Sequence, residues 1–285
     1  MALARAGAPA RLLLRQRALL WAAGVLVALA LMAVAGPLLW HDPPSQISLL
    51  SALQPPSWSH PMGTDGFGRD IFARFMRGAQ ISLLVGFIVV IAGALCGGIL
   101  GLVAGTWGGL REGLLMRAMD AILAFPALIL AMAVTVSLGV GVTTAVIGIT
   151  IASVPWYARV VRSEVVRIRA LPFVEAAIAL GARRRRVMFA HIVPSLLPTL
   201  LIQAAAAFGY SILALAALGF VGLGAQIPTP EWGAMITDGL SYTITGQWWV
   251  GVFPGLGLLI ATTAANVIAD RCRDILDPKG DYARV

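Results

Sequence analysis

Five stretches of this chain carry no Asp, Glu, Lys or Arg and are each long enough to cross a lipid bilayer. They run over residues 18–40, 78–110, 121–158, 187–230 and 239–269. A membrane-spanning helix needs about 20 consecutive apolar residues. Only 12% of the 285 residues are charged, against roughly a quarter in an ordinary soluble domain. We therefore expect an all-α membrane protein that crosses the bilayer several times.

The third stretch is too long for one crossing. A single helix over residues 121–158 would be about 57 Å long, nearly twice the hydrocarbon thickness of a bilayer. Residues 138–141, Leu-Gly-Val-Gly, favour a tight reversal because glycine tolerates the backbone angles that a turn needs. The sequence thus predicts six transmembrane helices, over residues 18–40, 80–104, 119–138, 142–159, 199–221 and 248–269.

The positive residues predict which helix ends are cytoplasmic. If the N-terminus is inside, 18 of the 21 Lys and Arg residues lie in cytoplasmic segments, and only Arg69, Arg74 and Arg77 lie outside. This asymmetry follows the positive-inside rule. We expect both termini to be cytoplasmic, and the net charge of +8 indicates topology rather than binding to nucleic acid.

The N-terminus has an alternative interpretation as a cleaved signal peptide. Arginines precede an apolar run that ends in Ala33-Val34-Ala35-Gly36, as in such signals. The run is longer than the roughly 7 to 15 residues that are usual there, and cleavage would leave five spans. A first transmembrane helix is therefore the favoured reading.

Several kinds of chemistry are missing from the sequence. Lys279 is the only lysine and is followed by glycine, so the phosphate-binding loop of ATPases is absent. The three histidines, His41, His60 and His191, lack metal-ligand spacing, and the two cysteines fall in a span and in the inner tail, so neither a metal site nor a disulfide is expected. We predict no enzymatic activity.

The spans also lack ionisable groups. Only Asp120 lies near one, at the inner edge of the third span, where it is interpreted as a carboxylate near a helix N-terminus and close to Arg117. Ion-coupled carriers usually place such groups in mid-membrane. A protein of this kind is either a passive channel or is driven by a partner, and an ion-coupled carrier is the further alternative.

A short apolar segment flanked by arginines follows the fourth span. Residues 170–182 carry one charge, Glu175, and are too few to cross the membrane. Pro172 suits the first turn of a helix and Gly181 suits its C-terminal stop. The apolar positions of one face are Leu171, Val174 and Ile178.

That face must be buried, because exposing apolar surface costs about 25 cal/mol per Å². It packs either under its own bundle or against another protein, and periodicity alone leaves both open. The arginines at 183–186 likewise fit lipid headgroups or a charged surface that faces a partner.

Several motifs in a fixed order resemble a known family. Glu175-Ala176-Ala177, then Gly181, then Ile192-Val193-Pro194, resembles the EAA loop of binding-protein-dependent ABC importer permeases. Residues 60–70, HPMGTDGFGRD, are similar to the H-x-x-G-T-D-x-x-G-R-D signature of the dipeptide, oligopeptide and nickel permease family. Further similar landmarks are AFP at 124–126, FVGLG at 220–224, PTPEWG at 228–233 and DILDP at 274–278.

The resemblance extends from about residue 11 onward and is to the DppC/OppC-type subunit. It implies a type I ABC importer (MetI-like) permease core with one extra N-terminal helix, in the inner membrane of a prokaryote. The implied function is the transmembrane permease subunit of an ATP-driven, binding-protein-dependent importer of dipeptides or oligopeptides. Nickel chelates, glutathione or haem-like cargo are alternative substrates.

The resemblance also implies partners. These are a homologous permease subunit, two ATPase subunits, an external peptide-binding protein and the lipid bilayer. The chain itself would be non-catalytic and hold no cofactor, because ATP and Mg bind to the ATPase subunits.

In this family the EAA loop, here residues 160–197, forms a coupling helix that docks into the ATPase, which favours a partner for the short apolar helix. Its residues would be Leu171, Phe173, Glu175, Ala176, Ala177, Ile178 and Gly181. The external motif comprises Gly63, Thr64, Asp65, Gly68, Arg69 and Asp70. Residues 1–77 would then hold the N-tail, first span and external segment, residues 78–270 the permease core, and residues 271–285 a cytoplasmic tail.

Three positions depart from the family pattern. Gln80 stands in place of an arginine, Leu215 in place of a glutamate, and Val193 in place of a leucine. The first two remove charge near the expected pathway, so they leave the substrate open but not the class of transporter.

The translocation pathway is expected to be lined by uncharged polar side chains. A wholly apolar lumen would leave a translocating zwitterion unsolvated, at a cost of several kcal/mol. The residues predicted to line the pathway are Gln203, Tyr210, Ser211 and Asn266. Hydrogen bonds between helices are the alternative role for each.

Residues 66–77 are predicted to form a helix on the outer membrane surface. Its apolar stripe would be Ile71, Phe72, Phe75 and Met76, opposite Arg69, Arg74 and Arg77. Such a helix anchors through apolar burial and arginine snorkelling. A plain first turn of the second span is the alternative.

Overall fold

The computed structural model describes residues 8–276, and within them it contains helices and loops but no β-strand. The N-tail before residue 8 and the C-tail from residue 277, with Asp277, Pro278 and Lys279, lie outside the described residues. The helices are α1 (Ala8–Leu39), α2 (Ile71–Trp107), α3 (Gly109–Leu123), α4 (Ala127–Leu138), α5 (Val142–Arg169), α6 (Pro172–Ala179), α7 (Arg184–Val187), α8 (Val193–Phe220), α9 (Trp232–Thr243) and α10 (Trp249–Leu276). The prediction of an all-helical protein is confirmed.

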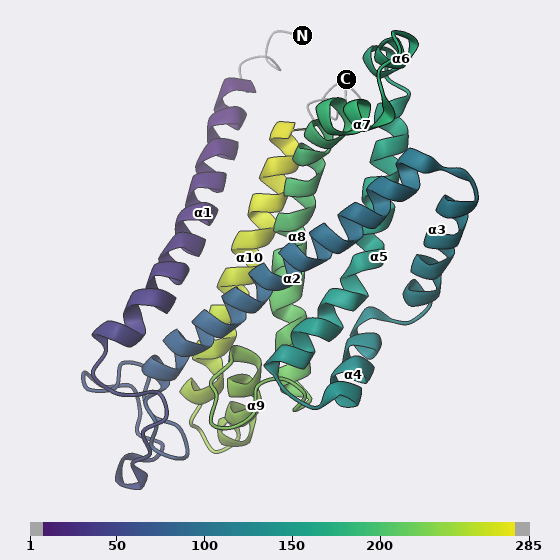
Figure 1. The fold of residues 1–285 in the computed structure, drawn as a ribbon. Helices are drawn as coiled ribbons and strands as arrows, with labels where there is room; N and C mark the ends of the chain where they lie inside the picture. The colour runs from purple at the N-terminus through teal and green to yellow at the C-terminus, as the bar shows by residue number, and fades with distance from the viewer. Residues whose placement is uncertain (1–7, 277–285) are drawn as a thin grey trace.

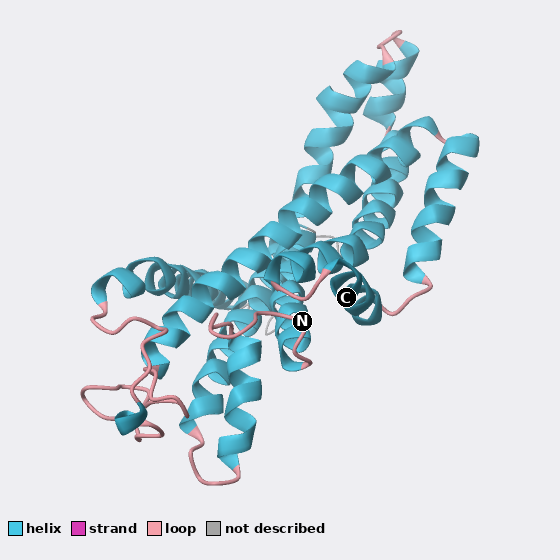
Figure 2. Ribbon diagram, turned by 60° about the horizontal axis from the view of Figure 1, so that its bottom comes forward, coloured by secondary structure: helices cyan, strands magenta, loops and turns pink. Residues whose placement is uncertain are grey.

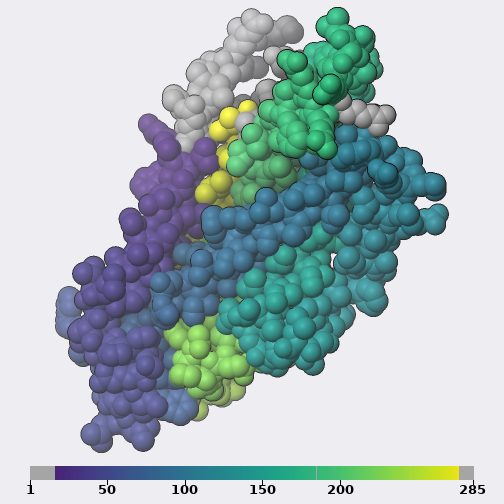
Figure 3. All heavy atoms as spheres, in the orientation of Figure 1, coloured from purple at the N-terminus to yellow at the C-terminus, as the bar shows by residue number. Residues whose placement is uncertain are grey.

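The long helices form a bundle with functional segments at its two ends. In Figure 1, α6 and α7 lie at one end, and the loop between α1 and α2 lies with α9 at the other. Helix α2 crosses the bundle diagonally, and Figure 3 shows it running over the face turned to the viewer while α6 projects beyond the bundle. Figure 2 shows that the loops gather beyond the helix ends, with the longest loop region around a short 3-10 turn, Leu49–Ser51.

The third predicted span is not a continuous helix. Five helices are long and apolar enough to cross a membrane, and a sixth crossing exists only if α3 and α4, which meet at 86°, count as one. The break falls at residues 124–126, where Pro126 caps α4 and disfavours helical geometry at Phe125. The expectation of an unbroken helix over residues 119–138 was therefore wrong.

A row of glycines lets α2 and α5 approach closely. A side chain added at Gly97 would lie 2.4 Å from the Val154 carbonyl oxygen, and one at Gly101 would lie 2.4 Å from the Ala158 carbonyl oxygen. Gly93 and Gly105 extend the row at the same four-residue spacing, which places all four on one helix face. Small residues at such positions are how membrane helices pack backbone to backbone.

The opposite end of α2 is held by α9. The ring of Trp232, which is fully buried, lies 5.5 Å from that of Phe75, and its Nε1 donates to the Phe75 carbonyl at 3.2 Å. Glu231 caps α9 by accepting hydrogen bonds from the backbone N–H groups of Gly233 and Ala234 at 2.9 and 3.0 Å. The Ser82 hydroxyl of α2 donates to the same carboxylate at 3.2 Å.

Candidate functional site

Helix α6 begins and ends as the sequence predicts. Pro172 occupies its first turn after an extended Leu171, and Glu175 lies in the first turn. At the C-terminus Gly181 has φ +83°, its N–H donates to Ile178, and the next N–H, of Ala182, donates back to Ala177. This paired pattern is a Schellman stop, which favours glycine.

The apolar face of α6 is divided between its own bundle and solvent. Val174 is fully buried among Val161, Val165 and Ile168 of α5, and Leu171 packs against the same cluster. Ile178 was expected on that face but is half-exposed, as is Phe173, and Leu180 is 88% exposed. Packing under its own bundle is therefore observed for Leu171 and Val174, and packing of the exposed residues against another protein stays a prediction.

The polar side chains around α6 are also turned outward. Glu175 is exposed and, within residues 8–276, has no hydrogen-bond or ion-pair partner. Ala176 is exposed and Ala177 half-buried, and the arginines Arg183, Arg185 and Arg186 are exposed beside them. An exposed apolar patch ringed by charge is typical of a protein interface.

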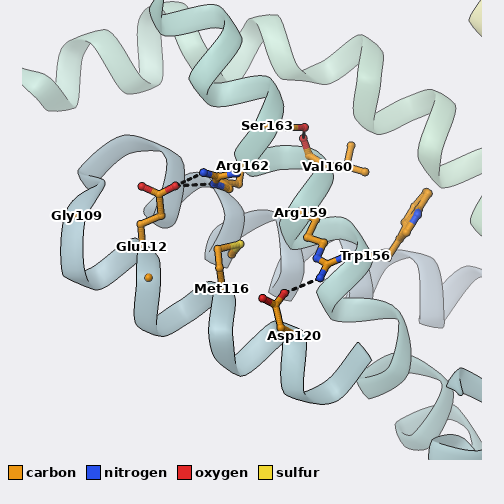
Figure 4. A pocket seen from close by; sticks show the side chains of 10 residues that line it. Gly109, Glu112, Met116, Asp120, Trp156, Arg159, Val160, Arg162 and Ser163 are labelled. Carbon is orange, nitrogen blue, oxygen red and sulfur yellow. Dashed lines mark hydrogen bonds and ion pairs between the residues drawn. The ribbon is translucent and has the colours of Figure 1, made fainter. Parts of the chain in front are cut away.

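A charged cleft of about 840 Å³ lies between α3 and α5. Figure 4 shows two ion pairs across it, Glu112 with Arg162 and Asp120 with Arg159, and Met116 between them. Arg159 Nη2 lies 2.6 Å from Asp120 Oδ1, and Arg162 Nε donates to Glu112 at 2.7 Å. Asp120 was expected to lie close to Arg117, and in the structure its ion-pair partner is Arg159 of α5.

An apolar cavity of about 380 Å³ lies deeper in the bundle. It is enclosed by α2, α5, α8 and the break between α3 and α4, and Tyr210 and Ser211 are among its lining residues. Trp156 lines both this cavity and the charged cleft. The two spaces therefore share a wall at Trp156.

The predicted pathway residues do not converge on one space. Tyr210 and Ser211 line the cavity, although the Ser211 hydroxyl is also bonded to the Ala207 carbonyl at 2.7 Å. Gln203 is half-buried and Asn266 is exposed on α10, and neither is among the cavity's lining residues. Leu215, expected near the pathway, is instead fully buried in the helix core.

The sequence reasoning missed Trp156 and Arg159. Both follow from one available signal, an aromatic residue one helical turn before the first arginine of the fourth span. Residues at i and i+3 share a helix face, and both side chains line the charged cleft.

The external motif folds around Asp65. Its carboxylate accepts from the backbone N–H groups of Phe67 and Arg69 at 2.9 and 3.0 Å, and from Arg69 Nε at 2.7 Å. Arg74 Nε lies 3.5 Å from the same carboxylate. Gly68 has φ +69° and packs so closely that a side chain there would lie 1.8 Å from the Ser48 carbonyl oxygen.

The rest of the motif joins this loop to α2. Thr64 accepts from the Gln54 N–H at 2.8 Å, and Gly63 has φ +74°. Asp70 caps α2 by accepting from the Ala73 N–H at 2.9 Å. The motif residues thus shape a compact loop.

The prediction of a surface helix over residues 66–77 was wrong. Helix α2 begins at Ile71 and continues without a break to Trp107, and Ile71, Phe75 and Met76 are buried in the protein. Arg69 and Arg74 are buried as well, because Asp65 draws both guanidinium groups inward. The segment is the first turns of the second span, which was the alternative.

Comparisons with known proteins agree with this architecture. The family described as "Binding-protein-dependent transport system inner membrane component" matches residues 97–281. The chain is 40% identical over 255 residues to the "Probable D,D-dipeptide transport system permease protein DdpC" of Escherichia coli (strain K12), covering 90% of this chain and 85% of that protein.

A second relative is also a transport permease, and one solved transporter structure has a similar fold. The "Dipeptide transport system permease protein DppC" of Alkalihalophilus pseudofirmus is 42% identical, with 90% of this chain and 84% of the relative covered. A chain of the MetNI methionine ABC transporter, in inward facing conformations, has a TM-score of 0.58 at 20% identity, covering 72% of this chain and 97% of that chain. This last likeness concerns the fold alone.

Proposed function

This chain belongs to the family of inner-membrane components of binding-protein-dependent transport systems, and we propose that it is the permease subunit of an ATP-driven importer of dipeptides or oligopeptides. The peptide substrate rests on the names of its relatives. Nickel chelates, glutathione and haem-like cargo are the alternatives within this class.

The observation that carries the proposal is the exposed surface of α6. Phe173 and Ile178 are half-exposed and Leu180 is 88% exposed, beside Glu175, which has no partner within residues 8–276. Exposed apolar side chains of this size are rarely grouped without a partner. Val174 anchors the same helix to α5. A force on the exposed face of α6 would therefore be transmitted into the membrane bundle.

We place α6 and both termini in the cytoplasm, and the loop between α1 and α2 with α9 on the outer side. The arginine-rich α5–α7 region then lies inside, as the positive-inside rule requires. The end with α6 is called the inner end below, and the end with α9 the outer end.

The partners follow from this placement. Two ATPase subunits would bind at the inner end, a homologous permease would complete the pathway, and an external binding protein would deliver the peptide. Nucleotide and its Mg²⁺ bind to the ATPase subunits, and this chain contributes no catalytic group. Closure of the ATPases would switch the bundle between two arrangements by alternating access.

The coupling role is tested with Gly181→Val and Glu175→Ala in the reconstituted transporter. Valine at Gly181 meets no neighbouring atom, but φ +83° strains its backbone and disturbs the end of α6. We expect each variant to insert normally and to lose most of its substrate-stimulated ATP hydrolysis. Full peptide uptake by both variants would refute the assignment.

The pathway is tested with single cysteines at Tyr210 and Gln203 in a protein lacking Cys96 and Cys272. Tyr210 lines the apolar cavity and Gln203 does not, so Gln203 is the matched control on the same helix. We expect a membrane-impermeant thiol reagent to label position 210 in one nucleotide state and not another. Labelling at 210 that never changes during ATP cycling would show that the cavity is not part of the pathway.

A further inference from the structure

Three side chains that are distant in sequence converge at the outer end of the bundle. Asp42 follows the end of α1, Asp70 caps the start of α2, and His60 lies in the loop between them. His60 Nδ1 lies 3.3 Å from Asp70 Oδ1 and 3.9 Å from Asp42 Oδ2, and the three nearest ligand atoms all lie within 4.8 Å of one another. No metal site was expected from the sequence, because the three histidines lack metal-ligand spacing.

The two carboxylates of this cluster have little to neutralise them. The Asp70 side chain is 2% exposed and that of Asp42 is 25% exposed. In the described part of the chain neither forms an ion pair with an arginine or lysine, since the nearby Arg69 and Arg74 are engaged by Asp65. Buried carboxylates are normally paired with a cation or bound to a metal.

The remaining bonds of Asp70 leave one oxygen directed at the cluster. Its Oδ2 accepts from Trp40 Nε1 at 2.7 Å and from the Ala73 N–H at 2.9 Å. Among the described residues, its Oδ1 has one hydrogen-bond partner, the imidazole of His60 at 3.3 Å. Fixing one carboxylate oxygen through hydrogen bonds while the other stays available is how outer-shell groups orient a metal ligand.

The geometry suits a small divalent cation. In a tetrahedral site with bonds of about 2.0 Å, neighbouring ligand atoms lie about 3.3 Å apart. The His60–Asp70 separation matches this distance, and the Asp42–His60 separation of 3.9 Å is wider. The cluster lines a cavity of about 210 Å³, whose wall also includes Ser48, Ser51 and Gln46. That space is large enough for an ion together with ordered water.

We propose that Asp42, His60 and Asp70 form a binding site for one divalent cation of the Zn²⁺ class. One imidazole nitrogen and two carboxylate oxygens are a ligand set that Zn²⁺ accepts.

A bound ion would link α1, the extra N-terminal helix, to α2 of the permease core. Asp42 is attached to α1, whereas Asp70 begins α2, so coordination joins the two helices at their outer ends. The site is independent of the peptide pathway, which lies on other residues.

The test is isothermal titration of Zn²⁺ into the full-length chain, purified with its partners and freed of metal with a chelator. We expect one site, with binding at least about tenfold weaker in His60→Asn and in Asp42→Asn. Asp42→Asn keeps the cap on α2 intact, so a loss of affinity there does not reflect unfolding. His191→Asn, at the other end of the bundle, is the matched control and should bind as the native chain does.

A melting curve gives a second readout. Zn²⁺ should raise the melting temperature of the native chain and of His191→Asn, and should leave that of His60→Asn unchanged, because only the bound state is stabilised. Absence of Zn²⁺ binding to the native chain, or equal binding by His60→Asn, would overturn the proposal and show that contacts between imidazole and carboxylate alone hold the cluster.

Discussion

The two ends of the bundle differ in how far their charged side chains are buried and paired. At the outer end Asp65, Arg69, Arg74 and Glu231 are buried, and each is bonded to a neighbour within the chain. At the inner end Glu175 is exposed and has no partner within residues 8–276. In the cleft between α3 and α5, away from the outer end, the ion pair of Asp120 and Arg159 is more than half exposed. The difference indicates that the outer end is built to hold its own shape, whereas the inner end presents groups to other proteins.

The largest loss in the free energy of unfolding is expected from substituting Asp65, around which the outer loop folds. Asp65→Ala leaves two buried guanidinium groups without their carboxylate, and breaking a buried ion pair from one side costs about 3–5 kcal/mol. Asp120→Ala makes the same chemical change in an exposed pair, for which about 0–1 kcal/mol is expected. Thermal unfolding of the two purified variants compares the buried pair with the exposed pair directly, and equal losses would remove the distinction between them.

The next effect concerns the crossing of α2 and α5, which connects the two ends. Gly97→Leu should destabilise the protein by about 3 kcal/mol, because its side chain collides with the backbone of α5. The neighbouring Gly98 has no atom within 4 Å of an added side chain, so Gly98→Leu is a close control. If Gly98→Leu lowers the melting temperature as much as Gly97→Leu, close packing of the helices is not the cause.

A smaller effect is expected at the cap of α9. Glu231→Ala leaves the N–H groups of Gly233 and Ala234 without an acceptor in a buried position, at a cost of about 2 kcal/mol. Glu175→Ala at the inner end should leave stability unchanged, even though it impairs coupling. Differential scanning of both variants checks this, and a stability loss in Glu175→Ala would mean that its side chain has a structural role.

We also expect the stability of the protein to depend on pH through Glu231. Burial raises the pKa of the Glu231 carboxyl above its ordinary value of 4.5, so the folded protein holds this proton more tightly than the unfolded chain. Its contribution to stability is therefore complete below pH 4.5 and declines as the pH rises through the raised pKa. Glu231→Gln should flatten this decline, and an unchanged pH profile in that variant would assign the slope to another group.

Local patterns predicted α6 well, because a proline, an early carboxylate and a glycine stop act within two helical turns. Local patterns predicted the wrong structure where a residue outside the segment determines how the segment packs. The stripe over residues 66–77 had the correct periodicity, but Asp65 lies before the helix and turns the arginine face inward. The break at Pro126 was visible in the sequence as a motif, yet neither its 86° angle nor the pairing of Asp120 with α5 follows from local sequence.

The cluster of Asp42, His60 and Asp70 shows the same limit more sharply. Its members come from the end of one helix, a loop and the start of the next, and only the folded loop brings them together. Tyr210 and Ser211 line the apolar cavity, whereas Gln203 on the same helix does not, because a seven-residue spacing places two residues on one helix face but not at one depth in the bundle. Their place in the translocation pathway stays a prediction.

The central claim is that the inner end is an interface for the ATPase subunits. It is tested most directly by placing a photo-crosslinking amino acid at Ile178 of α6, or at Ile244 beyond α9, in the assembled transporter. Both side chains are exposed in this chain, but only Ile178 belongs to the inner end. The account predicts a covalent adduct with an ATPase subunit from position 178 and none from position 244. Absence of an adduct at 178 in every nucleotide state, or an equal adduct at 244, would contradict it.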